Sequence, residues 1–169
     1  MRRIAKFHKV SPAQFAKDWK DTFPTADEKE ILSVYENIRL PLRATAGSAG
    51  YDFFAPVDIT LAPGETAKIP TGIAMEIPTG YAGLIFARSS LGVKRGLAPA
   101  NKVGVVDSDY RGEFLIFLYN QSQEPQTVAP GERVAQLVIV PVRQAHFEEV
   151  DTLEETQRGQ GGFGSTGRF

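Results

Sequence analysis

Apolar residues between positions 11 and 38 recur with the period of a helix, and no later part of the chain shows that period as clearly. The first helical stripe has the spacing i, i+3, i+4 and i+7 and consists of Pro12, Phe15, Ala16 and Trp19. Ser11 stands before the stripe as an N-cap, with proline in the first helical position. The sequence therefore predicts a helix that starts at residue 12 and ends at the Phe23-Pro24 pair.

A second helix is predicted to follow up to residue 38. Residues 25–28 have the pattern of a capping box that starts at Thr25. The apolar stripe of this helix consists of Ile31, Val34, Tyr35 and Ile38. Two such helices form a hairpin that must dock either on the body of its own chain or on a neighbouring copy. We assign residues 1–38 to an N-terminal strand and helical hairpin extension.

From about residue 40 the chain consists of short runs rich in β-forming residues, divided by Pro-Gly turns. The turns lie at residues 62–65, 77–80 and 129–132. The strands are predicted at residues 66–77, 81–87, 113–120 and 133–142. This regular punctuation predicts an all-β barrel or sandwich, which we assign to residues 39–152.

The strand predicted at residues 134–142 is apolar on both of its alternating faces. One face of a monomeric antiparallel sheet is normally in water. The strand is therefore either central in its sheet or covered by another subunit, and we favour burial in an oligomer.

Composition excludes several classes of function. The chain has 169 residues, enough for one domain with a sizeable core, and no cysteine for disulfides, zinc thiolates or nucleophilic catalysis. Its two histidines are far apart in sequence, and its net charge of −1 does not suit long nucleic acid. No apolar run reaches the roughly 20 residues of a membrane span. We expect an intracellular, cytoplasmic protein.

The last twelve residues, 158–169, contain five glycines and cannot build a core element. Backbone without side chains can converge its N–H groups on phosphate oxygens, and Phe163 can stack on a flat base. The alternative is a frayed glycine-rich terminus. We assign residues 153–169 to a flexible C-terminal arm.

Two polar patches lie in the first part of the β-rich region. Residues 49–52 place Asp52 at the start of a strand, where the alternative is a turn-forming aspartate. Arg88, Ser89 and Ser90 offer a guanidinium group and two hydroxyls within what we expect to be one loop. Their alternative is an exposed arginine beside a serine cap.

Two further patches lie later in the chain. In residues 104–113, Asp107 follows an apolar strand and can act as a general base, while Tyr110 can pack on a sugar. Asp109, Arg111 and Glu113 crowd into the same turn, more polar groups than a turn needs. In residues 133–137, Gln136 lies in an apolar strand and needs a hydrogen-bond partner from the protein or from a ligand.

These five patches resemble, in order and in approximate spacing, the five motifs of the trimeric deoxyuridine triphosphate nucleotidohydrolases (dUTPases). The resemblance covers residues 40–166. It implies a jelly-roll-like homotrimer with three active sites at subunit interfaces, each closed by the arm of another subunit. It also implies Mg²⁺-dependent hydrolysis of dUTP to dUMP and pyrophosphate, which keeps uracil out of DNA and supplies dUMP for thymidylate synthesis.

The resemblance also implies a role for each matching residue. Asp107 would activate the water that attacks the α-phosphorus, and Tyr110 would exclude a 2′-hydroxyl. The uracil would be read by the segment that contains Asn101 and Val106. The phosphate ligands would be Arg88, Ser89, Ser90, Gln136, Arg158, Gly164, Ser165 and Thr166. Phe163 would close over uracil, and Asp52 would reach Mg²⁺ through water.

The match has departures and rivals. Ala87 stands where the second motif usually has proline. A dCTP deaminase shares the fold, but Phe117 stands where its catalytic glutamate would lie, and Asp109-Tyr110 replaces its Gly-Trp pair. A second alternative is a non-catalytic trimeric regulator on the same fold.

Overall fold

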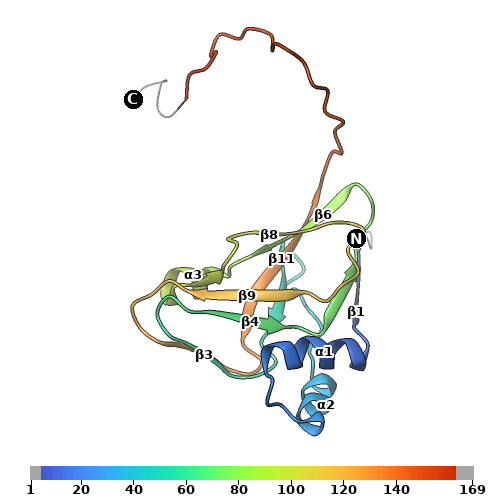
Figure 1. Ribbon diagram of the computed structural model, residues 1–169, viewed down its shortest axis with the longest axis vertical. Coiled ribbons are helices and arrows are strands. Elements are labelled where there is room, and N and C mark those ends of the chain that lie inside the picture. Colours follow the sequence, from blue (N-terminus) through green and yellow to red (C-terminus); the bar gives the residue numbers. More distant parts are fainter. Residues whose placement is uncertain (1–4, 163–169) are drawn as a thin grey trace.

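Antiparallel strands form the body of the molecule, and a helical hairpin lies against one end of it in the computed structural model, which describes residues 5–162 (Figure 1). The helices are α1 (Pro12–Thr22), α2 (Glu28–Glu36) and α3 (Ser89–Arg95). The first strands are β1 (Lys6–Lys9), β2 (Tyr51–Phe54), β3 (Ile59–Leu61), β4 (Thr66–Pro70), β5 (Ile73–Glu76) and β6 (Tyr81–Phe86). The later strands are β7 (Leu97–Pro99), β8 (Gly104–Val106), β9 (Leu115–Asn120), β10 (Gln126–Val128) and β11 (Arg133–Pro141).

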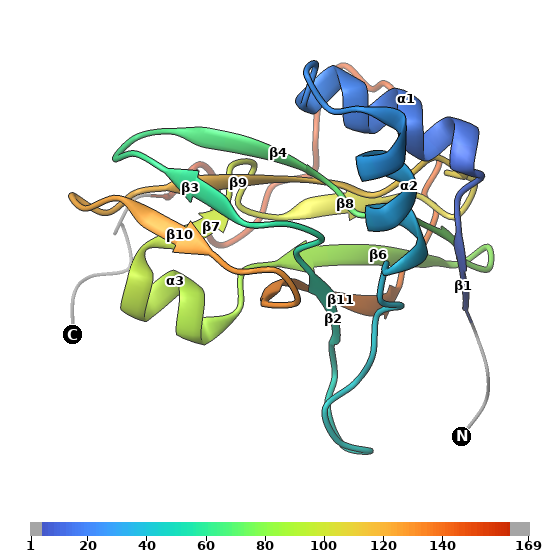
Figure 2. The same cartoon turned by 90° about the horizontal axis from the view of Figure 1, so that it is seen from below.

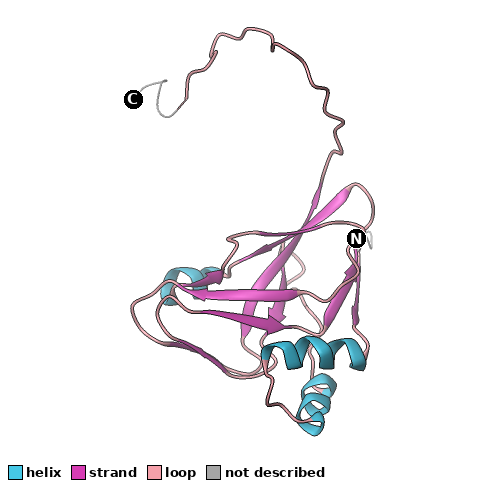
Figure 3. Cartoon of the chain, viewed as in Figure 1, coloured by secondary structure: helices cyan, strands magenta, loops and turns pink. Residues whose placement is uncertain are grey.

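The strands pair in a four-stranded sheet of order β2-β11-β6-β8 and a three-stranded sheet of order β4-β9-β7, with two further pairs, β1-β5 and β10-β3. Every strand pair is antiparallel. Figure 3 shows how strands dominate the described chain and how the helices stay at its periphery. This is the all-β, jelly-roll-like fold with an N-terminal helical hairpin that the sequence predicts. No helix among residues 5–162 is long and apolar enough to cross a membrane.

The first helix begins as predicted, because the Ser11 hydroxyl accepts a hydrogen bond from the Gln14 amide at 3.2 Å. The capping box at Thr25 is wrong. Helix α2 is capped by Asp27, whose carboxylate accepts a hydrogen bond from the Glu30 amide at 2.8 Å. An aspartate beside the first helical residue can reach the free amides of the first turn, so the helix starts two residues later than the box predicts.

The hairpin docks on the barrel of its own chain, one of the two alternatives left open by the sequence. Figure 2 shows both helices packed beside the strands. Phe15 and Trp19 of α1 are fully buried and belong to the same apolar core as Ile69 and Ile73 of the barrel. An ion pair between Asp21 and Lys68 closes the edge of this contact.

The strand predicted at residues 66–77 is divided into β4 and β5. Gly72 lies at the break with φ of +69°, a backbone conformation that favours glycine. A Cβ atom at this position would overlap Cδ1 of Ile38, which follows the hairpin. The break in the strand is therefore also the place where the hairpin approaches the barrel backbone most closely.

Strand β11 lies between β2 and β6, so its central position accounts for its doubly apolar pattern. Val134, Ala135 and Leu137 are fully buried within the single chain. Partial exposure is confined to the polar residues Arg133 and Gln136 and to the last residues of the strand, from Val138 onward. Burial in an oligomer is therefore not needed to explain why most of this strand is apolar on both faces.

A third helix replaces the loop expected after residue 88. Helix α3 starts at Ser89 and ends at Gly96, which has φ of +66°. Arg95 in its last turn donates hydrogen bonds to Gln126, to Glu132 and to the Thr127 carbonyl. The helical period was missed because seven residues are too few for a repeated apolar stripe.

The contact at Gly72 makes a testable prediction about the hairpin. Gly72→Ala should lower the free energy of unfolding by about 3 kcal/mol, from the left-handed backbone and from overpacking against Ile38. Gly80→Ala is the matched control, because Gly80 has φ of +86° but open space around its α-carbon. That control should cost about 1 kcal/mol. Thermal unfolding of both variants at one protein concentration measures these losses. Equal losses of stability in Gly72→Ala and Gly80→Ala would contradict the close approach of Gly72 to Ile38.

Candidate active site

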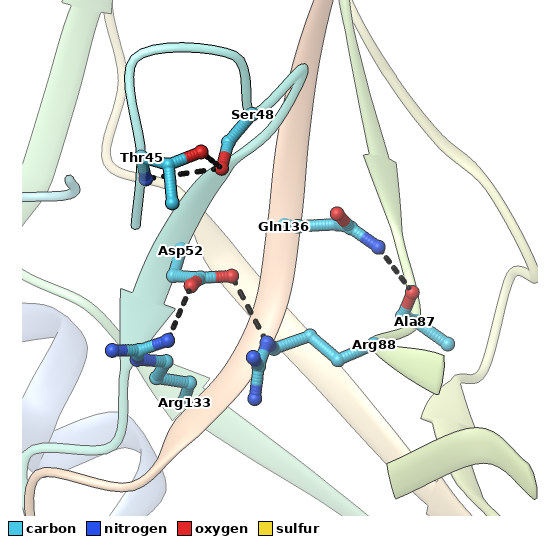
Figure 4. A network of polar contacts seen from close by, with 7 residues as sticks. All are labelled: Thr45, Ser48, Asp52, Ala87, Arg88, Arg133 and Gln136. Carbon is cyan, nitrogen blue, oxygen red and sulfur yellow. Dashed lines mark hydrogen bonds and ion pairs between the residues drawn. The ribbon is translucent and has the colours of Figure 1, made fainter. Parts of the chain in front are cut away.

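Two guanidinium groups hold Asp52 at the start of β2. The Asp52 carboxylate lies 3.0 Å from Nε of Arg88 and 3.2 Å from a terminal nitrogen of Arg133, one contact on each oxygen (Figure 4). Asp52 is buried, whereas the Arg88 and Arg133 side chains keep 27% and 39% exposure. The cluster carries one positive charge in excess, and its guanidinium groups face partly to solvent, which suits a polyanionic ligand.

Arg133 is a member of this cluster that the predicted site residues omit. It stands at the start of the strand that carries Gln136, and a register shift between Arg133 and Ala135 interrupts its pairing with β2. The signal was present, because a guanidinium group in an otherwise apolar strand needs a partner as much as an amide does.

Gln136 lies beside Asp52, since the two residues are directly paired between β11 and β2. Its side-chain amide donates a hydrogen bond of 3.0 Å to the Ala87 carbonyl (Figure 4). The sequence left open whether the partner was protein or ligand, and in this structure it is protein. Because the contact uses the Ala87 carbonyl, it does not depend on the side chain at the position where proline is usual.

The loop before β2 comes close to Gln136 at Gly50. The Ser48 hydroxyl binds the amide and the hydroxyl of Thr45 at 3.1 and 3.0 Å (Figure 4). A Cβ atom on Gly50 would lie 2.7 Å from Oε1 of Gln136, so glycine is required for this close approach. The small residues before Asp52 thus allow the backbone to pass over the Gln136 amide.

Ser89 and Ser90 form the first turn of α3 and are exposed. Arg88 is the N-cap residue and makes no side-chain capping bond. The amides of the first turn therefore have no capping side chain, and they lie beside two hydroxyls and a guanidinium group. This grouping of donors is the one predicted from the sequence, presented by a helix start rather than by a loop.

The second group of predicted residues lies around β8. Val106 is buried, whereas Asp107 is exposed in the single chain and follows the strand directly. Tyr110 is held in the turn, because its amide donates to the Asp107 carbonyl at 3.2 Å and its hydroxyl donates to the Glu113 carbonyl at 2.9 Å. Asn101 is exposed in the turn that joins β7 to β8.

The other polar residues of this turn have structural contacts. Arg111 donates to the carbonyls of Ser108 and Tyr110, which closes the turn. Glu113 points inward, and its carboxylate accepts the Gly72 amide at 2.6 Å. Burial, followed by the neighbouring Asp18 carboxyl, raises the pKa of Glu113 from 4.5 to about 7. Burial also raises the pKa of Tyr110. Arg111 therefore stabilises the turn, and Glu113 is part of the buried interior.

The two groups lie far apart within one chain. Val106 pairs with Gly83 in an antiparallel register, so Asp107 continues toward the beginning of β6, whereas Arg88 follows its end. At about 3.3 Å per residue, Asp107 and Arg88 are on the order of 20 Å apart along the sheet. Asp52 lies on β2 and Asp107 follows β8, and these are the two edge strands of the four-stranded sheet. One subunit does not bring the predicted site together.

As far as residue 162, the C-terminal arm runs away from both groups of its own chain. After β11 it leaves the barrel as an extended segment without strands or helices in its described part (Figure 1). Arg158 is exposed, and its side chain donates to the nearby Gly161 carbonyl at 2.8 Å. Phe163, Gly164, Ser165 and Thr166 lie outside the described residues.

Asp52 is the carboxylate that the described site offers to a metal ion. Residues 5–162 contain no group of three or more histidine, cysteine, aspartate or glutamate side chains placed so that they could hold such an ion. Each oxygen of Asp52 already has a guanidinium partner, but a carboxylate oxygen can accept a further bond from water. The residues therefore fit an ion that is carried by phosphate oxygens and reached by Asp52 through water.

The β-barrel fold, together with the guanidinium, hydroxyl and amide donors around Asp52, is typical of an enzyme that acts on nucleotide phosphates. The dUTPase family model matches residues 36–167, so the chain belongs to the dUTPase family. It is 51% identical over 142 residues to the deoxyuridine 5′-triphosphate nucleotidohydrolase of Thiobacillus denitrificans, covering 82% of this chain and 97% of that protein. It is 53% identical over 131 residues to that of Azotobacter vinelandii, covering 76% and 87%.

The fold is also similar to that of a solved phage enzyme. The dUTPase of Staphylococcus bacteriophage 80alpha with dUPNHPP has a TM-score of 0.76 and 27% identity, and the match covers 98% of this chain and 99% of that one. Family membership makes the chain a dUTP-hydrolysing enzyme. The relatives' shared name also favours hydrolysis of dUTP over the deaminase alternative.

The raised pKa of Glu113 predicts a pH-dependent stability. A carboxyl that binds its proton more tightly when folded stabilises the protein below pH 4.5, and this contribution is lost as the pH rises through about 7. Between these pH limits the free energy of unfolding should fall by up to about 3 kcal/mol because of Glu113, and Glu113→Gln should remove this fall. Glu124→Gln, at an exposed carboxylate, should retain it. Urea unfolding from pH 4 to pH 8 measures both, and parallel curves for native protein and Glu113→Gln would contradict the assignment.

Proposed function

We propose that Asp107 is the general base of dUTP hydrolysis. Its carboxylate takes a proton from a water molecule, whose oxygen attacks the α-phosphorus of dUTP. The bond from the α-phosphorus to the bridging oxygen breaks, and pyrophosphate leaves with that oxygen. The products are dUMP and pyrophosphate, so the reaction keeps uracil out of DNA and supplies dUMP for thymidylate synthesis. The exposed position of Asp107 at the end of β8 supports this role, because water can reach it.

The triphosphate would bind at the cluster around Asp52. Arg88, Ser89 and Ser90 supply charged and hydroxyl donors, and Arg133 adds a second guanidinium group. Gln136 orients the approach through its bond to the Ala87 carbonyl. A fixed set of donors around the phosphates stabilises charge that develops as pyrophosphate leaves.

Mg²⁺ is the proposed cofactor of this site. It prefers oxygen ligands, keeps several waters and binds through substrate phosphates, which suits a protein that offers only Asp52 through water. When bound, it would neutralise charge on the leaving pyrophosphate.

The nucleoside would lie against the turn around β8. The segment from Asn101 to Val106 would read uracil, and the Tyr110 ring would face the deoxyribose and exclude a 2′-hydroxyl. Two bonds hold Tyr110 in place, from its amide to Asp107 and from its hydroxyl to Glu113, and they support a rigid sugar wall. A dUTP analogue is bound in the structure of the related phage enzyme, which supports dUTP as the ligand.

The separation of Asp107 from Arg88 is the observation that most strongly supports a site shared between subunits. A base on the order of 20 Å from the phosphate donors of its own chain cannot serve them. Because both groups are needed around one α-phosphorus, we infer that neighbouring subunits of a homotrimer share each site. The arm supports the same inference, because it extends away from its own barrel (Figure 1). Arg158 and residues 163–166 would then close a neighbour's site over the γ-phosphate and uracil.

The general-base role predicts a separation of binding from turnover. Asp107→Asn should lower kcat by at least about a thousandfold and leave the affinity for a non-hydrolysable dUTP analogue within about twofold of native. Asp58→Asn, at another exposed aspartate, is the control and should keep native turnover. Pyrophosphate release from dUTP measures kcat, and near-native release by Asp107→Asn would refute the role.

Site sharing predicts activity from two inactive proteins. Equal amounts of Asp107→Asn and Arg88→Gln subunits, assembled at random, should recover about a quarter of native activity if the two residues serve different subunits' sites. They should recover none if one chain supplies both. Mixing native subunits with the double variant gives the converse result, about a quarter for shared sites and about half for unshared ones.

A further inference from the structure

Glu113 is a buried carboxyl for which the proposed mechanism has no use. It is 3% exposed and lies between β8 and β9, three residues after Tyr110. Its Oε1 accepts the Gly72 amide at 2.6 Å, but its Oε2 is enclosed and receives no hydrogen bond from the described residues. An enclosed acceptor without a donor is costly, so Oε2 is more stable when it carries a proton.

Helix α1 brings a second carboxyl close to Glu113. The Asp18 side chain favours the protonated form of Glu113 and, after burial, helps to raise its pKa. Gln14, one turn earlier on the helix, donates to an Asp18 carboxylate oxygen at 2.6 Å, which restrains the aspartate on the helix. The protonated Glu113 beside Asp18 therefore joins the hairpin to the turn after β8.

The backbone at Gly72 makes a second link between the same parts. The Val10 amide, just before α1, donates to the Gly72 carbonyl at 2.9 Å, while the Gly72 amide binds Glu113. Phe114 is fastened to the same segment by its amide, which donates to Ile73 at 2.8 Å, and by its carbonyl, which accepts from the Thr71 hydroxyl at 2.7 Å. Any shift of the hairpin is thus transmitted to residues 113 and 114.

Tyr110 receives its position from these two residues. Its hydroxyl donates to the Glu113 carbonyl at 2.9 Å, and its ring lies 6.3 Å from the Phe114 ring. Tyr110 as a residue is 44% exposed, so few other contacts restrain it in the single chain. Its orientation depends on where the Glu113 peptide lies.

We propose that Glu113 is a positioning residue through which the N-terminal hairpin holds Tyr110 against the sugar and so sets the discrimination between dUTP and UTP. The proposal rests on the role of Tyr110 proposed above. The groups that face the Glu113 carboxyl are Asp18 from α1, the backbone of Thr71 and Gly72 between β4 and β5, and Tyr110 from its own turn. When Glu113 and Asp18 are both ionised they repel each other, and the hold on the turn weakens.

The test measures kcat/KM for dUTP and for UTP between pH 6 and pH 8. Glu113→Ala should raise the ratio of UTP to dUTP turnover on the order of tenfold, because the turn loses its anchor and the sugar wall shifts. Glu113→Gln should restore the native ratio, since its amide oxygen can accept the Gly72 amide and its amino group can donate to Asp18. Glu124→Ala is the exposed control and should leave the ratio unchanged.

The pH profile separates this role from general support of the fold. In the native enzyme the UTP to dUTP ratio should rise as the pH passes about 7 and Glu113 ionises. Glu113→Gln should give a flat profile. Asp18→Asn should also flatten it, and this variant remains informative if Glu113→Ala does not fold. A native-like profile in either variant would overturn the proposal.

Tyr110→Ala distinguishes the inference from the function on which it rests. If Tyr110→Ala fails to admit UTP, Tyr110 is not the sugar wall, and both claims fall. If it admits UTP while folded Glu113→Ala discriminates like native enzyme, the sugar wall stands and the positioning role is overturned. If both claims hold, the double variant should show the ratio of Tyr110→Ala alone, and an additive effect would again overturn the positioning role.

Discussion

Strand β6 pairs with β11 on one side and with β8 on the other, and this double pairing determines where the chemistry of the chain can occur. Hydrogen bonds along both edges leave no freedom of register, so Arg88 must follow one end of the strand and Asp107 must lie near the other. This central strand thus separates the proposed phosphate donors from the proposed general base within one subunit. If both groups act on one α-phosphorus, as we propose, a neighbouring subunit must supply the missing half.

The two groups of residues are built in different ways. Around Asp52, charged side chains neutralise one another in part and leave one guanidinium charge in excess, which suits the triphosphate that we propose to bind there. Around Tyr110, the contacts are backbone hydrogen bonds and ring packing, which hold a surface in place rather than attract charge. Under the proposed function, the first group would bind phosphate and the second would match the shape of base and sugar.

The N-terminal hairpin is joined to this second group through more than apolar contact. Phe15 and Trp19 extend the barrel core. Gly72 accepts a hydrogen bond from the Val10 amide, just before α1, and donates one to Glu113. The family model begins at residue 36, after most of the hairpin. Most of the hairpin thus lies outside the residues that the family model matches, but it contacts the backbone segment that supports the turn around Tyr110. Under the inference above, such an extension would tune specificity without contributing a residue that touches substrate.

The sequence by itself determined the helix at Ser11-Pro12, the β-rich body and the residue types of each motif, because periodicity, capping and turn chemistry act over a few neighbouring residues. Only the tertiary structure decided that Asp52 is shared between Arg88 and Arg133, that Glu113 points into the core, and that Gly72 divides a strand. It also showed that Ser89 begins a helix and that Asp107 lies far from Arg88 in its own chain. Each of these features depends on contacts or strand register between segments distant in sequence, which no local pattern encodes.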